Sequence, residues 1–108
     1  MNNLINPITF DKNFFTANDN SMIPIIKNGD FVTITPFEND SFSVENGAIY
    51  VVSYYGDILI KRVTRNNKIK EVLLNSDNKE DYPQIKINCN EYDNFKILGR
   101  IVTRFGFL

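Results

Sequence analysis

Short runs of alternating apolar and polar residues, separated by Gly, Pro, Asn or Asp, recur along most of this chain. Successive side chains of a β-strand point to opposite faces, so this alternation predicts half-buried strands. The predicted strands occupy residues 31–37, 48–55, 57–65, 68–75, 82–88 and 95–105. The sequence therefore predicts a mostly β domain, a curled sheet or partial barrel, with at most a short helical turn after Ser21.

Three connections and irregularities of the predicted sheet can be located. Gly56-Asp57 is expected to form a hairpin turn between the strands on either side of it. Asn66-Asn67 is expected to form the next turn. Gly99 predicts a bulge or bend within the last strand, because an isolated glycine in a strand pattern often marks one.

The size and charge of the chain limit its class. Its 108 residues suffice for one domain, and a hydrophobic content of 43% supports a packed core. A net charge of −1 creates no basic surface for nucleic acid, so DNA binding would require another segment of a parent protein. We predict an N-terminal arm or linker remnant over residues 1–12 and the folded domain over residues 13–108.

Several residue types are absent or isolated. The chain has no histidine, which excludes Ser-His-Asp and Cys-His catalysis and most zinc sites. The single cysteine, Cys89, cannot form an internal disulfide, which fits a reducing compartment. The acidic stretch 77–81 lacks the ligand order of a calcium loop. With no membrane-spanning run and no signal peptide visible, we predict a cytoplasmic protein with no metal or cofactor.

Ser21 allows two interpretations. It follows Asn18-Asp19-Asn20 and precedes the turn predicted over residues 22–27, so it fits an ordinary N-cap whose hydroxyl accepts a backbone N–H. It could also be a nucleophile if a neutral lysine took its proton. The two roles are compatible, because amides gathered at a helix start can also stabilise an oxyanion.

Lys61 is the best candidate for such a lysine. Period two places it on the same strand face as Leu59 and Val63, within the apolar stretch "ILIKRV". Burial disfavours the ammonium form and moves a lysine pKa toward neutrality. The alternative is a lysine on an edge strand, where its charge prevents sheet-to-sheet aggregation.

Four segments, in order, resemble the LexA-like peptidases of family S24. "NSMIPIIKNGDFVTI" resembles their serine box, and "GAIYVVSYYGDILIKRV" resembles their lysine box. "LLNSDNKEDYPQIKIN" is similar to the Ser-Asn/Asp-Asn-x-x-Tyr-Pro segment of phage-type repressors, and "ILGRIV" to their closing strand. Together these segments cover about residues 13–104.

The resemblance implies a LexA/signal-peptidase-type β fold and a Ser–Lys dyad. Ser21 corresponds to the nucleophile and Lys61 to the general base, with the backbone amides of Asn20 and Ser21 forming the oxyanion site. In this family the domain follows a helix-turn-helix DNA-binding domain, forms homodimers, and cleaves its own N-terminal linker when a RecA-type filament stimulates it. The resemblance therefore implies the C-terminal domain of a phage-type repressor, with no membrane partner.

The sequence departs from the family pattern at several positions. Asp19, Asn20 and Ile25 stand where the pattern has Gly, Asp and Thr, and the family's Ala-Gly or Cys-Gly cleavage pair is absent. Any cleavage site is therefore expected upstream of Met1, as is any DNA-binding domain. Two alternatives remain: a non-catalytic dimerisation module of a transcriptional regulator, and an accessory protein of error-prone DNA synthesis similar to UmuD.

Overall fold

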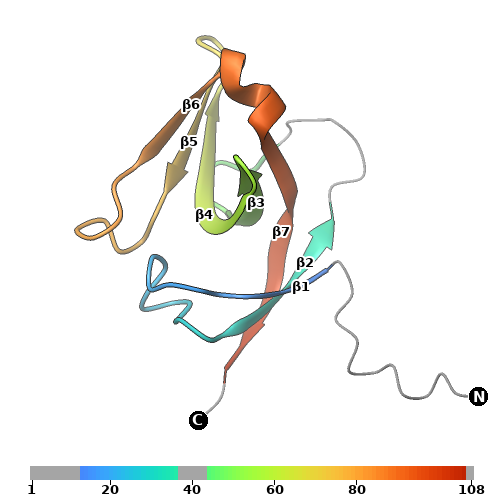
Figure 1. Ribbon diagram of the computed structural model, residues 1–108, viewed down its shortest axis with the longest axis vertical. Coiled ribbons are helices and arrows are strands. Elements are labelled where there is room, and N and C mark those ends of the chain that lie inside the picture. The colour runs from blue at the N-terminus through green and yellow to red at the C-terminus, as the bar shows by residue number, and fades with distance from the viewer. Residues whose placement is uncertain (1–12, 37–43, 107–108) are drawn as a thin grey trace, which may run out of the picture.

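The computed structural model describes residues 13–36 and 44–106 (Figure 1). These residues form one antiparallel sheet with the strand order β1-β2-β7-β3-β4-β5-β6. The strands are β1 (Phe14–Thr16), β2 (Phe31–Pro36), β3 (Ile49–Tyr54), β4 (Asp57–Asn66), β5 (Glu71–Asn75), β6 (Ile85–Asn88) and β7 (Phe95–Phe105). The predicted mostly β, curled sheet is confirmed, whereas the predicted arm, residues 1–12, lies outside the described residues.

The sheet curls (Figure 1), and its central strands bury side chains on both faces. On β3, the neighbours Val51 and Val52 belong to two different hydrophobic clusters. On β4, Ile60 belongs to the same cluster as Val51, and Val63 belongs to the same cluster as Val52. One cluster has members on every strand from β3 to β7 and consists of Tyr50, Val52, Val63, Val72, Leu74, Ile87, Phe95 and Ile97. The other consists of Ala17, Met22, Ile26, Val32, Ile34, Val51 and Ile60, and thus anchors the segment around Ser21.

The hairpin turn between β3 and β4 is Tyr55-Gly56, one residue earlier than the predicted Gly56-Asp57. Tyr54 pairs with Asp57, which leaves two residues in the loop. Both have positive φ, 49° at Tyr55 and 86° at Gly56. Such turns match the right-handed twist of the flanking strands, and glycine adopts this backbone conformation without steric cost. Asp57 is therefore free to begin β4.

β5 and β6 both begin later than the alternation predicted. Residues 67–70 form a turn before β5, in which the amide of Lys68 donates to Asn66 Oδ1 at 3.0 Å and Lys70 has a φ of 52°. Before β6, the amide of Tyr82 donates to the carbonyl oxygen of Asn78 at 3.1 Å in another turn. The predicted strands 68–75 and 82–88 thus included residues of these two turns, so the residue pattern alone did not locate the strand starts.

Gly99 lies at a bulge in β7, as predicted. Val51 pairs with Gly99 and Val52 with Ile97, so Leu98 is an extra residue on β7. A Cβ atom at Gly99 would overlap the carbonyl oxygen of Thr35. The glycine therefore allows β2 and β7 to approach closely at this point.

Two short elements were not predicted. β1 contains only three residues, too few for a period to be visible. The 3-10 helix η2 (Cys89–Asn94) joins β6 to β7, and Glu91 Oε2 accepts the amide of Asn88 at 3.1 Å at its start. The Asn88-x-x-Glu91 spacing is a capping signal that was visible in the sequence. Among the described residues, no helix is long and apolar enough to cross a membrane.

Candidate active site

Lys61 lies on β4, which has β3 on one side and β5 on the other. Its side chain is buried, with the residue 4% exposed. The prediction that it shares a strand face with Leu59 and Val63 is confirmed, because both of these residues pack in the cluster with members on β3 to β7. The alternative interpretation, an edge-strand lysine, is wrong. Lys61 pairs with Tyr50 of β3, and β5 pairs with β4 from Arg62 onward, so β4 is a central strand and not an edge strand.

The ammonium group of Lys61 has two close contacts. Its Nζ donates a hydrogen bond to Ser76 Oγ at 2.7 Å, and it lies 5.2 Å from the centroid of the Tyr82 ring. Burial lowers the pKa of Lys61 below that of an ordinary lysine, and the nearby Asp19 carboxylate acts in the opposite direction. A lysine in this environment loses its proton more readily than one in water.

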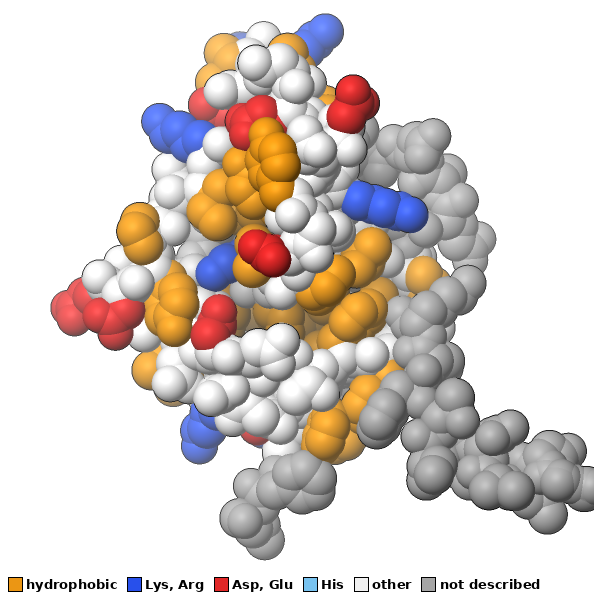
Figure 2. Space-filling model, viewed as in Figure 1, with side chains coloured by type: hydrophobic (Ala, Val, Ile, Leu, Met, Phe, Trp, Pro, Cys, Tyr) orange, Lys and Arg blue, Asp and Glu red, His pale blue; other side chains and the backbone are white. Residues whose placement is uncertain are grey.

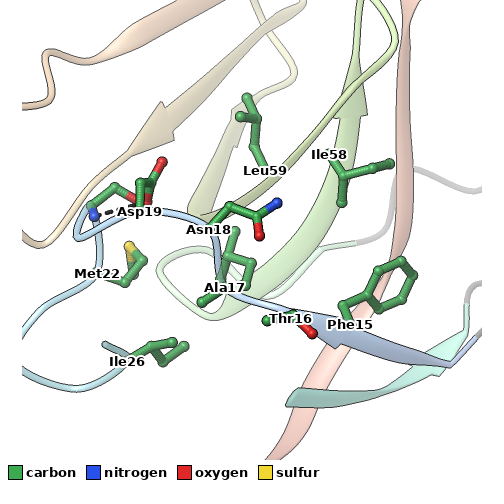
Figure 3. Close-up of a pocket in the computed structure, with 11 residues that line it drawn as sticks. Phe15, Thr16, Ala17, Asn18, Asp19, Met22, Ile26, Ile58 and Leu59 are labelled. Atoms are coloured by element: carbon green, nitrogen blue, oxygen red, sulfur yellow. Dashed lines mark hydrogen bonds between the residues drawn. The ribbon is translucent and has the colours of Figure 1, made fainter. Parts of the chain in front are cut away.

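Ser21 begins a tight turn on the other side of this site. The residue is 2% exposed, and the amide of Ile26 donates to the carbonyl oxygen of Met22 at 2.9 Å, which closes one helical turn after it. Asp19 Oδ1 accepts the amide of Ser21 at 2.9 Å (Figure 3). An aspartate that accepts a backbone N–H two residues later is a common turn-forming arrangement. Asp19 therefore provides an acceptor for a backbone amide at the start of the turn.

A pocket lies beside Ser21 (Figure 3). Its walls come from the segment that contains Ser21 and from the start of β4. The lining residues are Phe15, Thr16, Ala17, Asn18, Asp19, Ser21, Met22, Ile26, Ile58, Leu59 and Ile60. Figure 2 shows hydrophobic side chains in several groups on the face in view, one of them near its middle. Ser21 thus borders a small recess that is lined by both apolar and polar side chains.

The two amides that the sequence assigned to the oxyanion site already have acceptors. The amide of Ser21 donates to Asp19, and the amide of Asn20 donates to the hydroxyl oxygen of Tyr82 at 3.4 Å. An oxyanion could take these donors only after displacing the present acceptors.

Residues 76–82 connect the surroundings of Lys61 to those of Ser21. Ser76 accepts from Lys61, whereas the amide of Asn78 donates to the carbonyl oxygen of Ser21 at 2.9 Å. Tyr82 faces Lys61 with its ring and accepts the amide of Asn20 with its hydroxyl. The two candidate residues, forty positions apart in the sequence, therefore contact one and the same segment.

Strand register explains why this segment reaches Lys61. Arg62 lies opposite Asn75, the last residue of β5, so the chain leaves β5 beside Lys61. Arg62 also binds Asp77, which lies two residues after the end of β5. Its Nε donates to Asp77 Oδ1 at 2.7 Å and its Nη2 to Asp77 Oδ2 at 3.2 Å. This two-point contact to Asp77 raises the pKa of the Arg62 guanidinium and holds the loop against β4.

Ser76 is the site residue that the sequence did not reveal as functional. It stands in "LLNSDNKEDYP", a segment that contributed to the family resemblance, but no role was assigned to it. A serine before Asp-Asn is typical of a turn, and no periodic signal links it to a lysine on another strand.

The curled antiparallel sheet, with a buried lysine on a central strand and a serine at a tight turn, defines a β domain of the LexA type. The chain belongs to the Peptidase S24-like family, whose model matches residues 8–102.

The chain is also similar to a protein of Haemophilus influenzae described as an uncharacterized HTH-type transcriptional regulator. The two are 34% identical over 88 residues, which cover 82% of this chain. The same region covers 35% of that relative, so the chain spans about a third of its length.

Proposed function

We propose that this chain is the peptidase-like domain of a LexA-like transcriptional regulator, and that it cleaves its own polypeptide with a Ser21–Lys61 dyad. Membership of the Peptidase S24-like family and similarity to an HTH-type transcriptional regulator support the proposal. DNA binding is assigned to a helix-turn-helix domain of the longer protein. A RecA-type filament is the proposed stimulus, and a homodimer the proposed assembly.

The burial of Lys61 is the observation that carries the catalytic part of the proposal. A general base must be neutral, and water keeps an ordinary lysine protonated at neutral pH. At Lys61, burial lowers the pKa and so enlarges the neutral fraction at a given pH. A lysine with a purely structural role gains nothing from such an environment, because burying its charge costs stability.

In the proposed reaction, the neutral Nζ of Lys61 takes the proton of Ser21 Oγ while Oγ attacks the carbonyl carbon of the scissile peptide bond. The C–N bond then breaks, and the Lys61 ammonium gives its proton to the leaving nitrogen. Water attacks the resulting ester and loses a proton to Lys61. The ester bond breaks, and Lys61 returns that proton to Ser21 Oγ.

A Ser21→Ala variant of the full-length regulator is expected to produce no cleavage fragment at any pH. The wild type should cleave faster as pH rises, because only the neutral form of Lys61 accepts the serine proton. Since burial lowers its pKa, the rise should occur below the ordinary lysine value of 10.5. Gel analysis of fragments across a pH series measures both effects. Cleavage by Ser21→Ala at the wild-type rate would remove Ser21 from the mechanism.

Replacing Asp19 by asparagine is expected to shift the pH dependence of cleavage. Asn retains an oxygen that can accept the amide of Ser21 but removes the charge that favours protonated Lys61. The pKa of Lys61 should fall, so cleavage should begin at lower pH and be severalfold faster at neutral pH.

Asp81→Asn is the control, because Asp81 is an exposed acid of the segment 76–82 and, unlike Asp19, does not act on the pKa of Lys61. An Asp19→Gly variant, which also frees the amide of Ser21, separates the charge effect from the hydrogen bond. If Asp19→Asn and Asp81→Asn have the same pH profile, the Asp19 charge does not control Lys61.

A non-catalytic dimerisation module is the second candidate function. It is favoured by the acceptors of the Asn20 and Ser21 amides, because neither of these two amides is free to bind an oxyanion in this conformation. Under this proposal, the full-length wild type yields no fragment even at alkaline pH or with activated filaments, yet still dimerises. The C-terminal strand β7, where Val102 and Phe105 are exposed, is the proposed dimer contact.

A further inference from the structure

We propose that Ser76 is a positioning residue of the dyad: its hydroxyl holds the Nζ of Lys61 in place, and its loop joins that nitrogen to the Ser21 turn. The inference rests on the proposed function for its effect on cleavage. Its effect on Lys61 itself can be measured without any cleavage.

The contact between Lys61 and Ser76 is enclosed. The two residues are 4% and 2% exposed, and the Nζ–Oγ distance is 2.7 Å. A long lysine side chain has many rotamers, and a buried acceptor at its end selects one of them. Ser76 therefore restricts where Nζ can lie.

Ser76 is not itself suited to be the nucleophile. Ser21 lines the pocket beside the turn, whereas Ser76 is not among the residues that form that pocket. Ser76 also directly follows β5, and the ion pair with Arg62 holds the next residue, Asp77, against β4. A serine fixed in this way can orient a partner but is poorly placed to attack a peptide.

The same loop restrains the Ser21 side of the site. The amide of Asp77 contacts the sulfur of Met22 at 3.4 Å, and the amide of Asn78 donates to the carbonyl oxygen of Ser21. The side-chain amide of Asn78 also donates to the carbonyl oxygen of Asn20 at 3.3 Å. A displacement of Ser76 would therefore change the position of Lys61 relative to Ser21, which proton transfer does not tolerate.

The ionisable groups near Lys61 act on it through charge or ring contacts, whereas Ser76 acts through an uncharged hydroxyl. Asp19 supplies a negative charge from the Ser21 turn, Tyr82 presents its ring from the loop, and Arg62 and Asp77 neutralise each other beside it. Ser76 has no charge, so its removal should leave these interactions in place. What is lost is the acceptor that favours the protonated amine and orients it.

The test compares Ser76→Ala with Ser76→Thr in the full-length regulator. For Ser76→Ala we expect the highest cleavage rate, reached at alkaline pH, to fall by at least about tenfold. The start of cleavage should also move to lower pH, because the protonated amine has lost an acceptor. Ser76→Thr keeps the hydroxyl and should restore most of both properties. Ser53→Ala, a half-buried serine on β3 outside the site, is the matched control.

The second readout is NMR titration of the Lys61 side chain, which requires no cleavage. Ser76→Ala should lower the pKa of Lys61 and broaden or average its Cε–H resonances, while Ser76→Thr should resemble the wild type. Unchanged resonances and an unchanged pKa in Ser76→Ala would overturn the inference. If the wild type never cleaves but these shifts occur, the proposed function fails and the positioning of Lys61 by Ser76 stands. If Ser76→Ala does not fold, Ser76→Cys, which replaces the hydroxyl by a weak acceptor, is titrated instead.

Discussion

A Lys61→Met variant is expected to lose self-cleavage completely and, at the same time, to be more stable than the wild type. Methionine has no group that can accept a proton, so the proposed dyad cannot work. Its side chain is similar in length and apolar, and it can fill the space among Leu59, Val63 and Tyr82. Removing a buried charge often stabilises a protein, whereas Ser76 loses its donor, which costs some stability. We expect a net gain on the order of 1 kcal/mol.

The gain should depend on pH in a defined direction. Burial lowers the pKa of Lys61 in the folded state, so the unfolded chain binds the proton more tightly. Wild-type stability is therefore reduced below the folded-state pKa and recovers as pH rises toward the ordinary lysine value of 10.5. The advantage of Lys61→Met should be largest below the folded-state pKa and shrink toward alkaline pH.

Urea unfolding at several pH values, with cleavage assays on the same variants, measures both effects. Lys86→Met is the matched control, because Lys86 is exposed on β6 and should change neither stability nor cleavage. A Lys61→Met protein that is less stable than the wild type at every pH would show that Lys61 contributes more through its contacts than it costs through its buried charge.

A Gly99→Ala variant is expected to destabilise the domain by about 1–3 kcal/mol. The added methyl group would overlap the carbonyl oxygen of Thr35 and approach the side chain of Ile34. Thr35 is part of β2 and pairs with Arg100 of β7, so its carbonyl group cannot move without disturbing the pairing. The strands must separate or the bulge must change.

Thermal or urea unfolding of Gly99→Ala measures this cost. Lys96→Ala is the control on the same strand, because Lys96 is exposed and its truncation removes no buried contact. An unfolding midpoint of Gly99→Ala equal to that of the wild type would show that β2 and β7 can adjust to a methyl group at the bulge.

Most of the sheet could be predicted from the sequence because alternation is a local property. The bounds of β7 were predicted, and so were its bulge at Gly99 and the face on which Lys61 lies. The starts of β5 and β6 were not, because the turns at residues 67–70 and before Tyr82 extend into the predicted strands without a glycine to mark their ends. The hairpin turn was one residue off because its geometry requires positive φ at two positions, and only Gly56 signals one of them.

The sequence by itself determined that the domain is mostly β, that it has no histidine for catalysis, and that Lys61 has apolar neighbours on its face. These properties follow from residue types and a period of two. Only the tertiary structure decided that β4 is a central strand, that Lys61 is buried, and that Ser76 is its hydrogen-bond partner. These properties depend on strand order and register: Arg62 lies opposite Asn75, and the chain leaving β5 therefore passes Lys61 before it reaches Ser21. No local pattern encodes such a non-local pairing, because it is selected by the packing of the whole sheet.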